Sequence, residues 1–439
     1  MLTNMRAATS FVLQQSTRCR QNQHRAVSSF IGTQEHENAG SSHMTTTTTT
    51  AYHTWYQHSA RRTYKNANAL KTSRLFSTND QEVTDADKEL VAQTPLFRDA
   101  PHLLNGLDTY TIKAQDGHPI SVYGIHSKES DTSSESDDNA SKHRRPILML
   151  HGRTWSSVPV YHLLGGNNQT TGIASPTHHS RSLMEALHSA GLQPYCMDFR
   201  GFGGTPKDST GTVIPNQCVM DAETVLNFIT EKHFNDETMM DHHLPALMGW
   251  SQGALVAQLL AQKSPKMISK LVLYGSIYDP MVSYARQPLF INGTQGISEI
   301  DSDGDGVKAV GNTFNGAIED FTVEGSIPPA AAIEFAEAAL SSDPIKAHWH
   351  YLCQFNNCDA ARVHVPTLVV AGDQDPYAPL RIQGELFTNL GRGADRTWSI
   401  IADADHAVHM LDGTKERFLN IVKSFVENGK KGETTDYRE

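Results

Sequence analysis

Residues 249–253 have the sequence Gly-Trp-Ser-Gln-Gly, between the apolar run Pro245–Met248 and the helix-like segment Ala254–Leu260. A serine at a strand-to-helix junction is typical of a nucleophile elbow, a strained turn that leaves the hydroxyl exposed. The flanking glycines let the backbones approach closely. The pattern G-x-S-x-G is weak alone, but its position between a strand and a helix predicts that Ser251 is a nucleophile.

A serine nucleophile needs an adjacent base, and the base needs an orienting acid. The apolar strand predicted at 366–371 ends in Gly-Asp-Gln-Asp-Pro, and the strand predicted at 397–401 leads into a segment that contains His406 and His409. A crossover helix is expected between them, over 380–390. In open α/β sheets, the functional side chains lie at the carboxyl ends of the strands. The acid and the histidine are therefore expected to meet Ser251 at that edge.

Four more segments carry a resemblance to the alpha/beta-hydrolase superfamily over about residues 105–428. Pro146–Gly152 resembles its third strand with a His-Gly signature, Met197–Gly203 its D-x-R-G-x-G segment, Lys270–Ser276 its sixth strand and Gly372–Asp375 its G-x-x-D motif. The resemblance implies an α/β fold with a mostly parallel eight-stranded sheet, helices on both faces and a helical cap insertion. The motifs are specific to the superfamily and not to a substrate.

The resemblance also implies the site: Ser251 as nucleophile, Asp375 as acid and His406 as base. Asp373 is the alternative to Asp375 as the acid; if it is not the acid, it is expected to cap a loop. His409 is the alternative to His406 as the base; if it is not the base, it is expected to pack in the interior or line the pocket. The oxyanion hole is expected to use the backbone N–H groups of Gln252 and of Arg153, with Thr154 as the alternative to Arg153. His151 is expected to shape that loop and not to act as a base.

The domain organisation follows from the same segments. The hydrolase core is expected at 79–276 and 366–428, with a solvated, disordered Ser- and Asp-rich insertion at 127–145 and a tail at 429–439. Residues 277–365, with a helix predicted at 330–340, occupy the position of a cap, which would exclude water from the site. Within it, Asp301–Gly306 begins like an EF-hand loop, but Asn312 stands where the bidentate glutamate belongs, so no metal is expected. No cofactor is expected either.

The first 78 residues contain nine Lys or Arg and only two Glu, with a threonine run at 45–50. An Arg-rich, Ser-rich, acid-poor segment that cannot bury a core is typical of an organelle transit peptide. Arg74–Thr78 resembles a mitochondrial processing site with cleavage after Phe76, so a mitochondrial matrix protein is expected. A plastid address, a disordered tail of a cytoplasmic protein and a mis-set start codon are the alternatives.

The whole chain has a net charge of −11, and the residues after the leader carry −18. An acidic body without a basic patch argues against nucleic acid as a partner, and no apolar run is long enough to span a membrane. We expect a small ester-type substrate and a serine hydrolase that cleaves carboxylic esters or thioesters through an acyl-enzyme. The alternatives are a carbon–carbon bond hydrolase or another acyl-group hydrolase with the same triad, and a non-catalytic ligand-binding protein on this fold.

Overall fold

The computed structural model describes residues 82–126, 144–165, 180–233, 244–279, 294–295 and 309–427. The expected leader, nearly all of the 127–145 insertion, the Asp301–Gly306 segment and the tail lie outside these residues.

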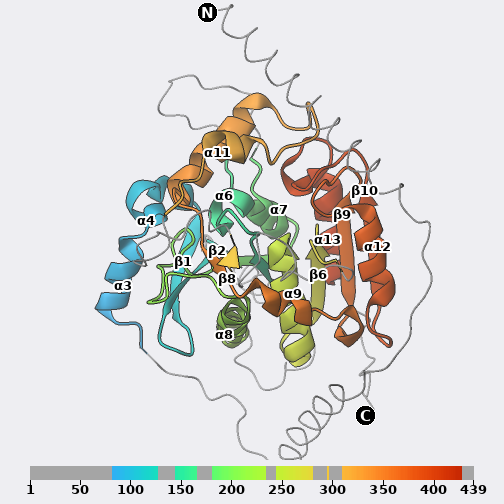
Figure 1. Cartoon of the computed structure of the whole chain (residues 1–439), viewed down its shortest axis with the longest axis horizontal. Coiled ribbons are helices and arrows are strands. Elements are labelled where there is room, and N and C mark those ends of the chain that lie inside the picture. The colour runs from blue at the N-terminus through green and yellow to red at the C-terminus, as the bar shows by residue number, and fades with distance from the viewer. Residues whose placement is uncertain are drawn as a thin grey trace, which may run out of the picture. The chain divides into compact units, whose positions relative to one another are not determined.

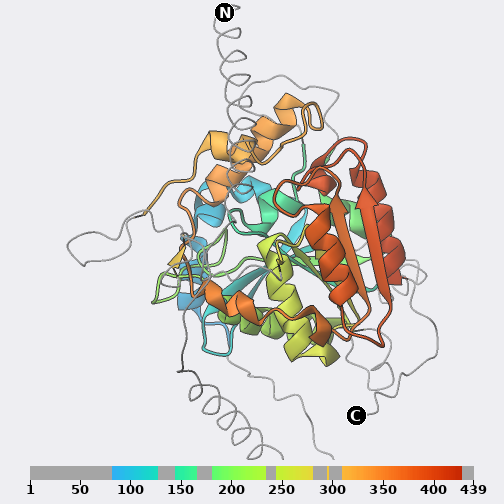
Figure 2. The same ribbon diagram turned by 45° about the vertical axis from the view of Figure 1, so that its right-hand side comes forward.

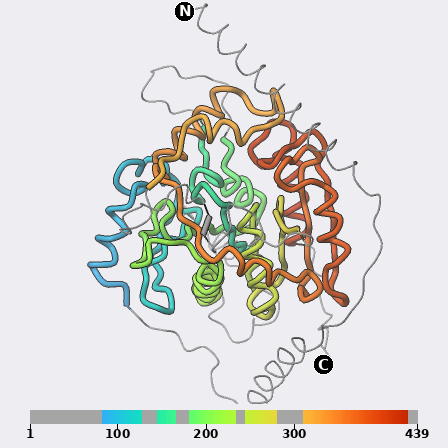
Figure 3. The backbone as a smooth tube through the Cα atoms, viewed as in Figure 1, coloured from blue at the N-terminus to red at the C-terminus, as the bar shows by residue number. Residues whose placement is uncertain are grey.

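Eight strands form one open sheet in the order β1-β2-β4-β3-β5-β6-β9-β10. One edge of the sheet, cyan in Figure 3, is formed by the antiparallel hairpin of β1 and β2, and the other edge, red, is formed by β10. Strand β2 pairs antiparallel with β4, and from β4 to β10 in this order each strand is parallel to the next. The sheet strands are β1 (Leu107–Lys113), β2 (Pro119–Ile125), β3 (Pro146–Leu150), β4 (Gln193–Met197), β5 (Ala246–Trp250), β6 (Lys270–Tyr274), β9 (Thr367–Gly372) and β10 (Arg396–Ile401).

Helices cover both faces of this sheet (Figure 2). Helices α7 (Leu183–Ser189) and α13 (Lys415–Glu427) bury their apolar stripes in the core on one face, and α8 (Pro215–His233), α9 (Gln252–Lys263) and α12 (Leu380–Asn389) in the core on the other. The central strands are buried along their whole length, as strands covered on both faces must be. The predicted mostly parallel eight-stranded fold with helices on both faces is therefore confirmed.

Residues 309–365 lie in the range 277–365 where a cap is expected and will be called the cap segment. Its residues Asp320, Asp343 and Trp349 contact the loop after β3, at the carboxyl edge of the sheet. Its longest helix, α11 (Pro329–Ser342), packs across α4 (Pro95–Asp99) and α6 (Ser157–Tyr161) (Figure 1). It also contains α10 (Phe314–Ile318) and β8 (Trp349–His350), which pairs with β7 (Thr294–Gln295). Helix α3 (Asp85–Ala92) precedes α4 at the start of the described chain.

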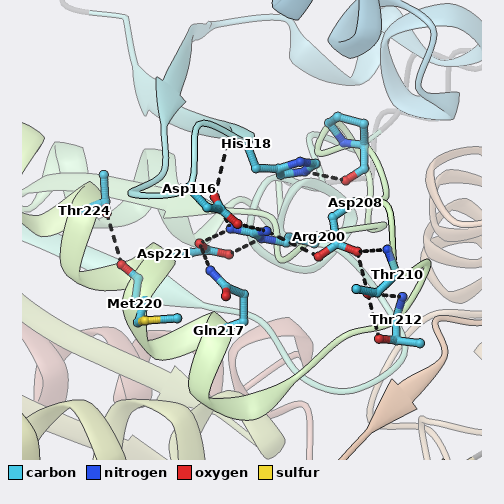
Figure 4. Close-up of polar contacts among 11 residues, drawn as sticks. Asp116, His118, Arg200, Asp208, Thr210, Thr212, Gln217, Met220, Asp221 and Thr224 are labelled. Carbon is cyan, nitrogen blue, oxygen red and sulfur yellow. Dashed lines mark hydrogen bonds and ion pairs between the residues drawn. The ribbon is translucent and has the colours of Figure 1, made fainter. Parts of the chain in front are cut away.

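Arg200 organises the loop after β4 (Figure 4). Its buried guanidinium makes paired hydrogen bonds of 2.7–2.9 Å to Asp116, in the β1–β2 turn, and of 2.8 Å to Asp221, in α8, and a longer contact of 3.3 Å to Asp208. Gln217 adds a hydrogen bond of 3.0 Å to Asp221. These contacts tie the loop after β4 to the β1–β2 turn and to the first half of α8.

Candidate active site

Ser251 is the single residue between β5 and α9. Its backbone has φ 58° and ψ −122°, a conformation that few residues other than glycine adopt. Its backbone N–H donates to the carbonyl of Tyr274 at 2.9 Å, so the turn is still tied to β6. Backbone strain of this kind costs about 1–3 kcal/mol and clusters at functional sites. The strained strand-turn-helix predicted from the sequence is confirmed.

The two elbow glycines are needed for close approach, as predicted. A side chain at Gly249 would overlap the carbonyl oxygen of Gly253, and one at Gly253 would overlap the carbonyl oxygen of His151. A Cβ atom at Gly152 would lie 3.2 Å from the Cβ of Ser251. The loop after β3 therefore runs directly beside Ser251.

The structure brings His406 and Asp375 together at the ends of adjacent strands β9 and β10. The Nδ1 of His406 lies 2.7 Å from Oδ2 of Asp375, and both side chains are buried. The other oxygen of Asp375 accepts the backbone N–H groups of Tyr377 at 2.9 Å and Ala378 at 2.8 Å. A carboxylate can only accept, so Nδ1 carries a proton and Nε2 is the ring nitrogen available for proton transfer.

The alternative acid and base have other partners. Asp373 accepts the backbone N–H of Ala404 at 3.3 Å, which caps the loop after β10. His409 is buried, and its Nε2 donates to the carbonyl of Val160 at 2.9 Å, so its Nδ1 must accept from the Tyr274 hydroxyl at 3.0 Å. Burial lowers the pKa of His409 to about 4. His409 is therefore neutral and part of the packing.

Two residues that were not predicted as part of the site lie against the backbone of His406. The indole N–H of Trp250 donates to the His406 carbonyl oxygen at 2.9 Å. The Tyr274 hydroxyl oxygen lies 3.0 Å from the same carbonyl oxygen, but its one hydrogen is donated to Nδ1 of His409. The His406 ring sits between Trp250, with centroids 5.1 Å apart, and Tyr377, with centroids 5.2 Å apart. The only sequence signal for Trp250 was its place beside Ser251.

Gly275, directly after β6, is a further unpredicted site residue. Its φ is 50°, and a Cβ atom there would lie 3.1 Å from Nδ1 and Cε1 of His406 and 3.3 Å from Oδ2 of Asp375. Real Cβ atoms rarely approach other atoms so closely. A glycine is thus required for the acid and the histidine to pack against the end of β6.

Asp405, the residue before His406, binds the backbone of the cap segment. Its buried carboxylate accepts the N–H of Ala407 at 2.9 Å through one oxygen, and those of Thr322 at 2.9 Å and Val323 at 3.4 Å through the other. It therefore joins the cap segment to the loop that carries His406. Within the described ranges, no group of three or more His, Cys, Asp or Glu is arranged to hold a metal ion.

The two residues predicted for the oxyanion hole lie in segments next to Ser251: Gln252 follows it in the chain, and Arg153 follows Gly152, which packs beside it. Gln252 is the first residue of α9, where the amide groups of the first turn have no partner within the helix. Arg153 lies in the loop after β3, and its carbonyl oxygen accepts the indole N–H of Trp349 at 3.0 Å. His151 shapes this loop: Nδ1 donates to Gly152 O at 2.9 Å and Nε2 accepts from Phe199 N at 3.1 Å. Burial lowers the pKa of His151 to about 3, so it is no base at neutral pH.

Aromatic residues of the cap segment divide into two groups. Trp349 and Phe355 are buried, whereas Phe314 and Tyr351 are exposed.

Across the described segments, no helix is both long and apolar enough to cross a bilayer.

The model of the alpha/beta hydrolase family matches residues 147–419, which is more than half of the chain. Two curated proteins match shorter segments. Polyketide synthase ThaQ from Burkholderia thailandensis is 31% identical over 193 residues, 42% of this chain and 8% of that protein. A probable alcohol acetyltransferase from Saccharomyces cerevisiae is 30% identical over 162 residues, 37% of this chain and 38% of that protein. The chain thus spans less than two fifths of either relative.

Solved structures that resemble the chain are distant in sequence. A thermophilic esterase from Thermogutta terrifontis is 16% identical, with a TM-score of 0.47 over 73% of this chain and 98% of that one. A serine hydrolase of carbazole degradation has 16% identity and a TM-score of 0.44, over 73% and 99%. A thioesterase domain from the curacin biosynthetic pathway has 14% identity and a TM-score of 0.41, over 74% and 100%. These likenesses concern the fold alone.

Proposed function

The chain belongs to the alpha/beta hydrolase family, and from this premise we propose that it is a serine hydrolase that cleaves carboxylic esters or thioesters. The observation that carries the proposal is the 2.7 Å hydrogen bond between His406 and Asp375, at the sheet edge where the strained turn presents Ser251. A base that is oriented by an acid beside a serine on such a turn is what acyl transfer requires.

In the proposed reaction, Nε2 of His406 takes the proton of Ser251 as its oxygen attacks the substrate carbonyl. Asp375 holds the Nδ1 proton and stabilises the imidazolium. The N–H groups of Gln252 and Arg153 stabilise the oxyanion. When the tetrahedral intermediate collapses, His406 returns the proton to the leaving alcohol or thiol, and the acyl group stays on Ser251. Water, deprotonated by His406, then attacks the acyl-enzyme; as the bond from the acyl carbon to Ser251 breaks, His406 returns the proton to the serine oxygen and the acid is released.

The first test is covalent labelling. A fluorophosphonate should react with the protein at Ser251 and not with the variant Ser251→Ala. An ester and thioester panel of increasing acyl length then identifies the preferred acyl group. A folded protein that neither reacts nor hydrolyses any panel member would overturn the proposal in favour of a non-catalytic ligand-binding protein.

A second fate of the acyl-enzyme is acyl transfer to an alcohol. The observation that favours it is the match to the protein named as a probable alcohol acetyltransferase. The same acyl-enzyme would then be attacked by an alcohol in place of water. Product analysis with a short-chain acyl thioester, with and without added alcohol, separates the two: a new ester product supports transfer, and the free acid alone supports hydrolysis.

We further propose that residues 1–78 direct the protein to the mitochondrial matrix, on the basis of their net charge of +7 and the Arg74–Thr78 sequence. N-terminal sequencing of the native protein should find Ser77 at the mature start. A start at Met1 would contradict this, as would import into plastids alone.

A further inference from the structure

Three contacts join the cap segment to the loop after β3, residues 152–156, which will be called the oxyanion loop. The first is the hydrogen bond of 3.0 Å from the Trp349 indole N–H to the carbonyl oxygen of Arg153. Trp349 is buried and packs against Phe199 and Phe202, with ring centroids 6.1 and 6.2 Å apart. Its strand is also bridged to Val213, so the donor is itself firmly held.

In the second contact, the oxyanion loop supplies the donor and the cap segment the acceptor. Trp155 of the oxyanion loop donates its indole N–H to Oδ2 of Asp320 at 2.7 Å. Trp155 is buried and meets Phe335 of α11 edge to face, with centroids 6.2 Å apart. Burial raises the pKa of Asp320, and the hydrogen bond from Trp155 opposes that rise.

The third contact is made by Asp343, the residue at the end of α11. Its carboxylate accepts the backbone N–H of Ser156 at 2.7 Å and that of Gly203 at 2.9 Å. Asp343 is 4% exposed. The cap segment therefore contacts the oxyanion loop at residues 153, 155 and 156, from three separate elements.

The peptide groups around Arg153 show what these contacts can do. The peptide between Gly152 and Arg153 carries the N–H proposed for the oxyanion hole, and its carbonyl accepts from His151 of the core at 2.9 Å. Because a trans peptide places N–H and C=O on opposite sides, this bond sets the direction of the Arg153 N–H. The next peptide is set by Trp349 of the cap segment. Core and cap thus each orient one of the two peptides that flank Arg153.

We propose that the cap segment positions the oxyanion hole, with Trp349 as the principal positioning residue and Trp155, through Asp320, as the second. The inference rests on the proposed function. Oxyanion donors act by being preorganised toward the developing charge, so a donor in a loop that can turn stabilises the transition state less. Loss of the Trp349 hydrogen bond lets the peptide after Arg153 rotate, so that the Arg153 N–H is restrained from one side only, by the bond from His151. Substrate binding in the ground state does not depend on this direction.

The test compares Trp349→Phe, which keeps a ring in the packing but removes the N–H, with Trp398→Phe, a matched change at a partly exposed tryptophan of β10. Both are measured as the full-length protein on the best ester found in the panel. We expect kcat to fall at least about 10-fold in Trp349→Phe with KM changed less than about 3-fold, because removing an oxyanion donor outright costs about 10²–10³. Trp398→Phe should match the parent.

A second readout separates positioning from simple structural support. A boronic acid that resembles the acyl group forms a tetrahedral adduct with the serine, and its affinity should weaken in parallel with kcat/KM. The affinity of the reaction product, which carries no tetrahedral oxyanion, should not change. If Trp349→Phe lowers the melting temperature but the folded protein retains its kcat and boronic acid affinity, the role is structural and the proposal is overturned.

Trp155→Phe, which removes the hydrogen bond to Asp320 and keeps a ring against Phe335, provides the independent variant if Trp349→Phe does not fold. It should show the same loss in kcat and in boronic acid affinity, to a smaller degree; an unchanged kcat would overturn the proposal. A parent protein without hydrolysis or fluorophosphonate labelling would instead refute the proposed function, so the two failures are distinguishable.

Discussion

The indole nitrogen of Trp250 lies 2.9 Å from the carbonyl oxygen of His406, a residue 156 positions later in the chain. The residue directly before the proposed nucleophile therefore holds the backbone of the proposed base. The hydroxyl of Tyr274, at the end of the neighbouring strand, donates to His409 Nδ1 at 3.0 Å and accepts the backbone N–H of His409 at 3.3 Å. Two adjacent strands thus support the loop that carries His406.

These contacts predict that the two variants differ in their effect on activity. Trp250→Phe leaves the buried His406 carbonyl without its donor, so it should lower the free energy of unfolding by about 1–3 kcal/mol and kcat a few-fold. Tyr274→Phe removes the hydroxyl that donates to His409 Nδ1, so it should cost a similar free energy of unfolding but affect kcat less. Urea unfolding and ester kinetics measure both quantities. A larger loss of kcat in Tyr274→Phe than in Trp250→Phe would show that the Trp250 contact does not hold the His406 loop in place.

The strain at Ser251 predicts that two inactive variants, Ser251→Ala and Ser251→Gly, differ in stability. Ser251→Ala and Ser251→Gly should both abolish ester hydrolysis and fluorophosphonate labelling. Glycine adopts φ 58° without strain, so Ser251→Gly should be more stable than Ser251→Ala by about 1 kcal/mol, despite the greater entropy of glycine in the unfolded chain. Urea unfolding of both variants measures this. Retained hydrolysis in either variant would exclude Ser251 as the nucleophile.

The two aspartates after β9 should differ sharply. Asp375→Asn removes the acceptor of the His406 Nδ1 proton, a change that can cost about 10⁴ in kcat. Asp373→Asn weakens only a cap on the loop after β10, so its kcat should stay within a few-fold of the parent. The two variants make a matched pair for kcat measurements. The reverse order would place the acid two residues earlier.

Gly275→Ala should damage the site out of proportion to its effect on stability. The added methyl group would press on the ring of His406 at 3.1 Å and displace the acid–histidine pair. Gly211→Ala is the control, because Gly211 also has a positive φ, 65°, but a Cβ atom there has no neighbour within 4 Å. Both should lose about 1 kcal/mol of stability from the backbone, and only Gly275→Ala should lose kcat, by at least about 10-fold. Equal activity in both would show that the site tolerates the methyl group.

Buried histidines predict a loss of stability in mild acid. Burial lowers the pKa of His151 to about 3 and of His409 to about 4. An unfolded histidine titrates near 6.5. Between these values the unfolded chain binds more protons, so stability is complete above about pH 6.5 and falls as the pH drops toward 4, by up to about 1.4 kcal/mol per pH unit for each group.

The check is thermal unfolding of the parent and of His409→Gln between pH 7 and pH 4. The glutamine variant is expected to be less stable at pH 7, because it alters the contacts with Val160 and Tyr274. Its melting temperature should nevertheless fall less steeply with acidity than that of the parent. An equally steep fall would mean that His409 takes up no proton on unfolding in this range.

Local sequence patterns determined the fold and the candidate residues. Apolar strands that end in Gly-x-Ser or in Gly-Asp-Gln-Asp carry their polar groups just beyond the strand, and parallel strands place these ends along one edge. For that reason Ser251, Asp375 and His406 could be proposed before any contact was known. The strand-turn-helix at Ser251 was recognisable because glycines and apolar runs specify local backbone shape.

The tertiary structure decided which of the neighbouring groups meet. Asp373 and Asp375 differ by two positions in one loop, and only the packing of β9 against β10 shows that Asp375 reaches the histidine. The same holds for Gly275, Asp405 and Trp349, whose partners in the site lie 82 to 196 residues away in the chain. A close approach between distant segments leaves no periodic trace in a single sequence, because it depends on how the layers pack and not on local propensity. The support of the oxyanion loop by the cap segment is for this reason visible only in the folded chain.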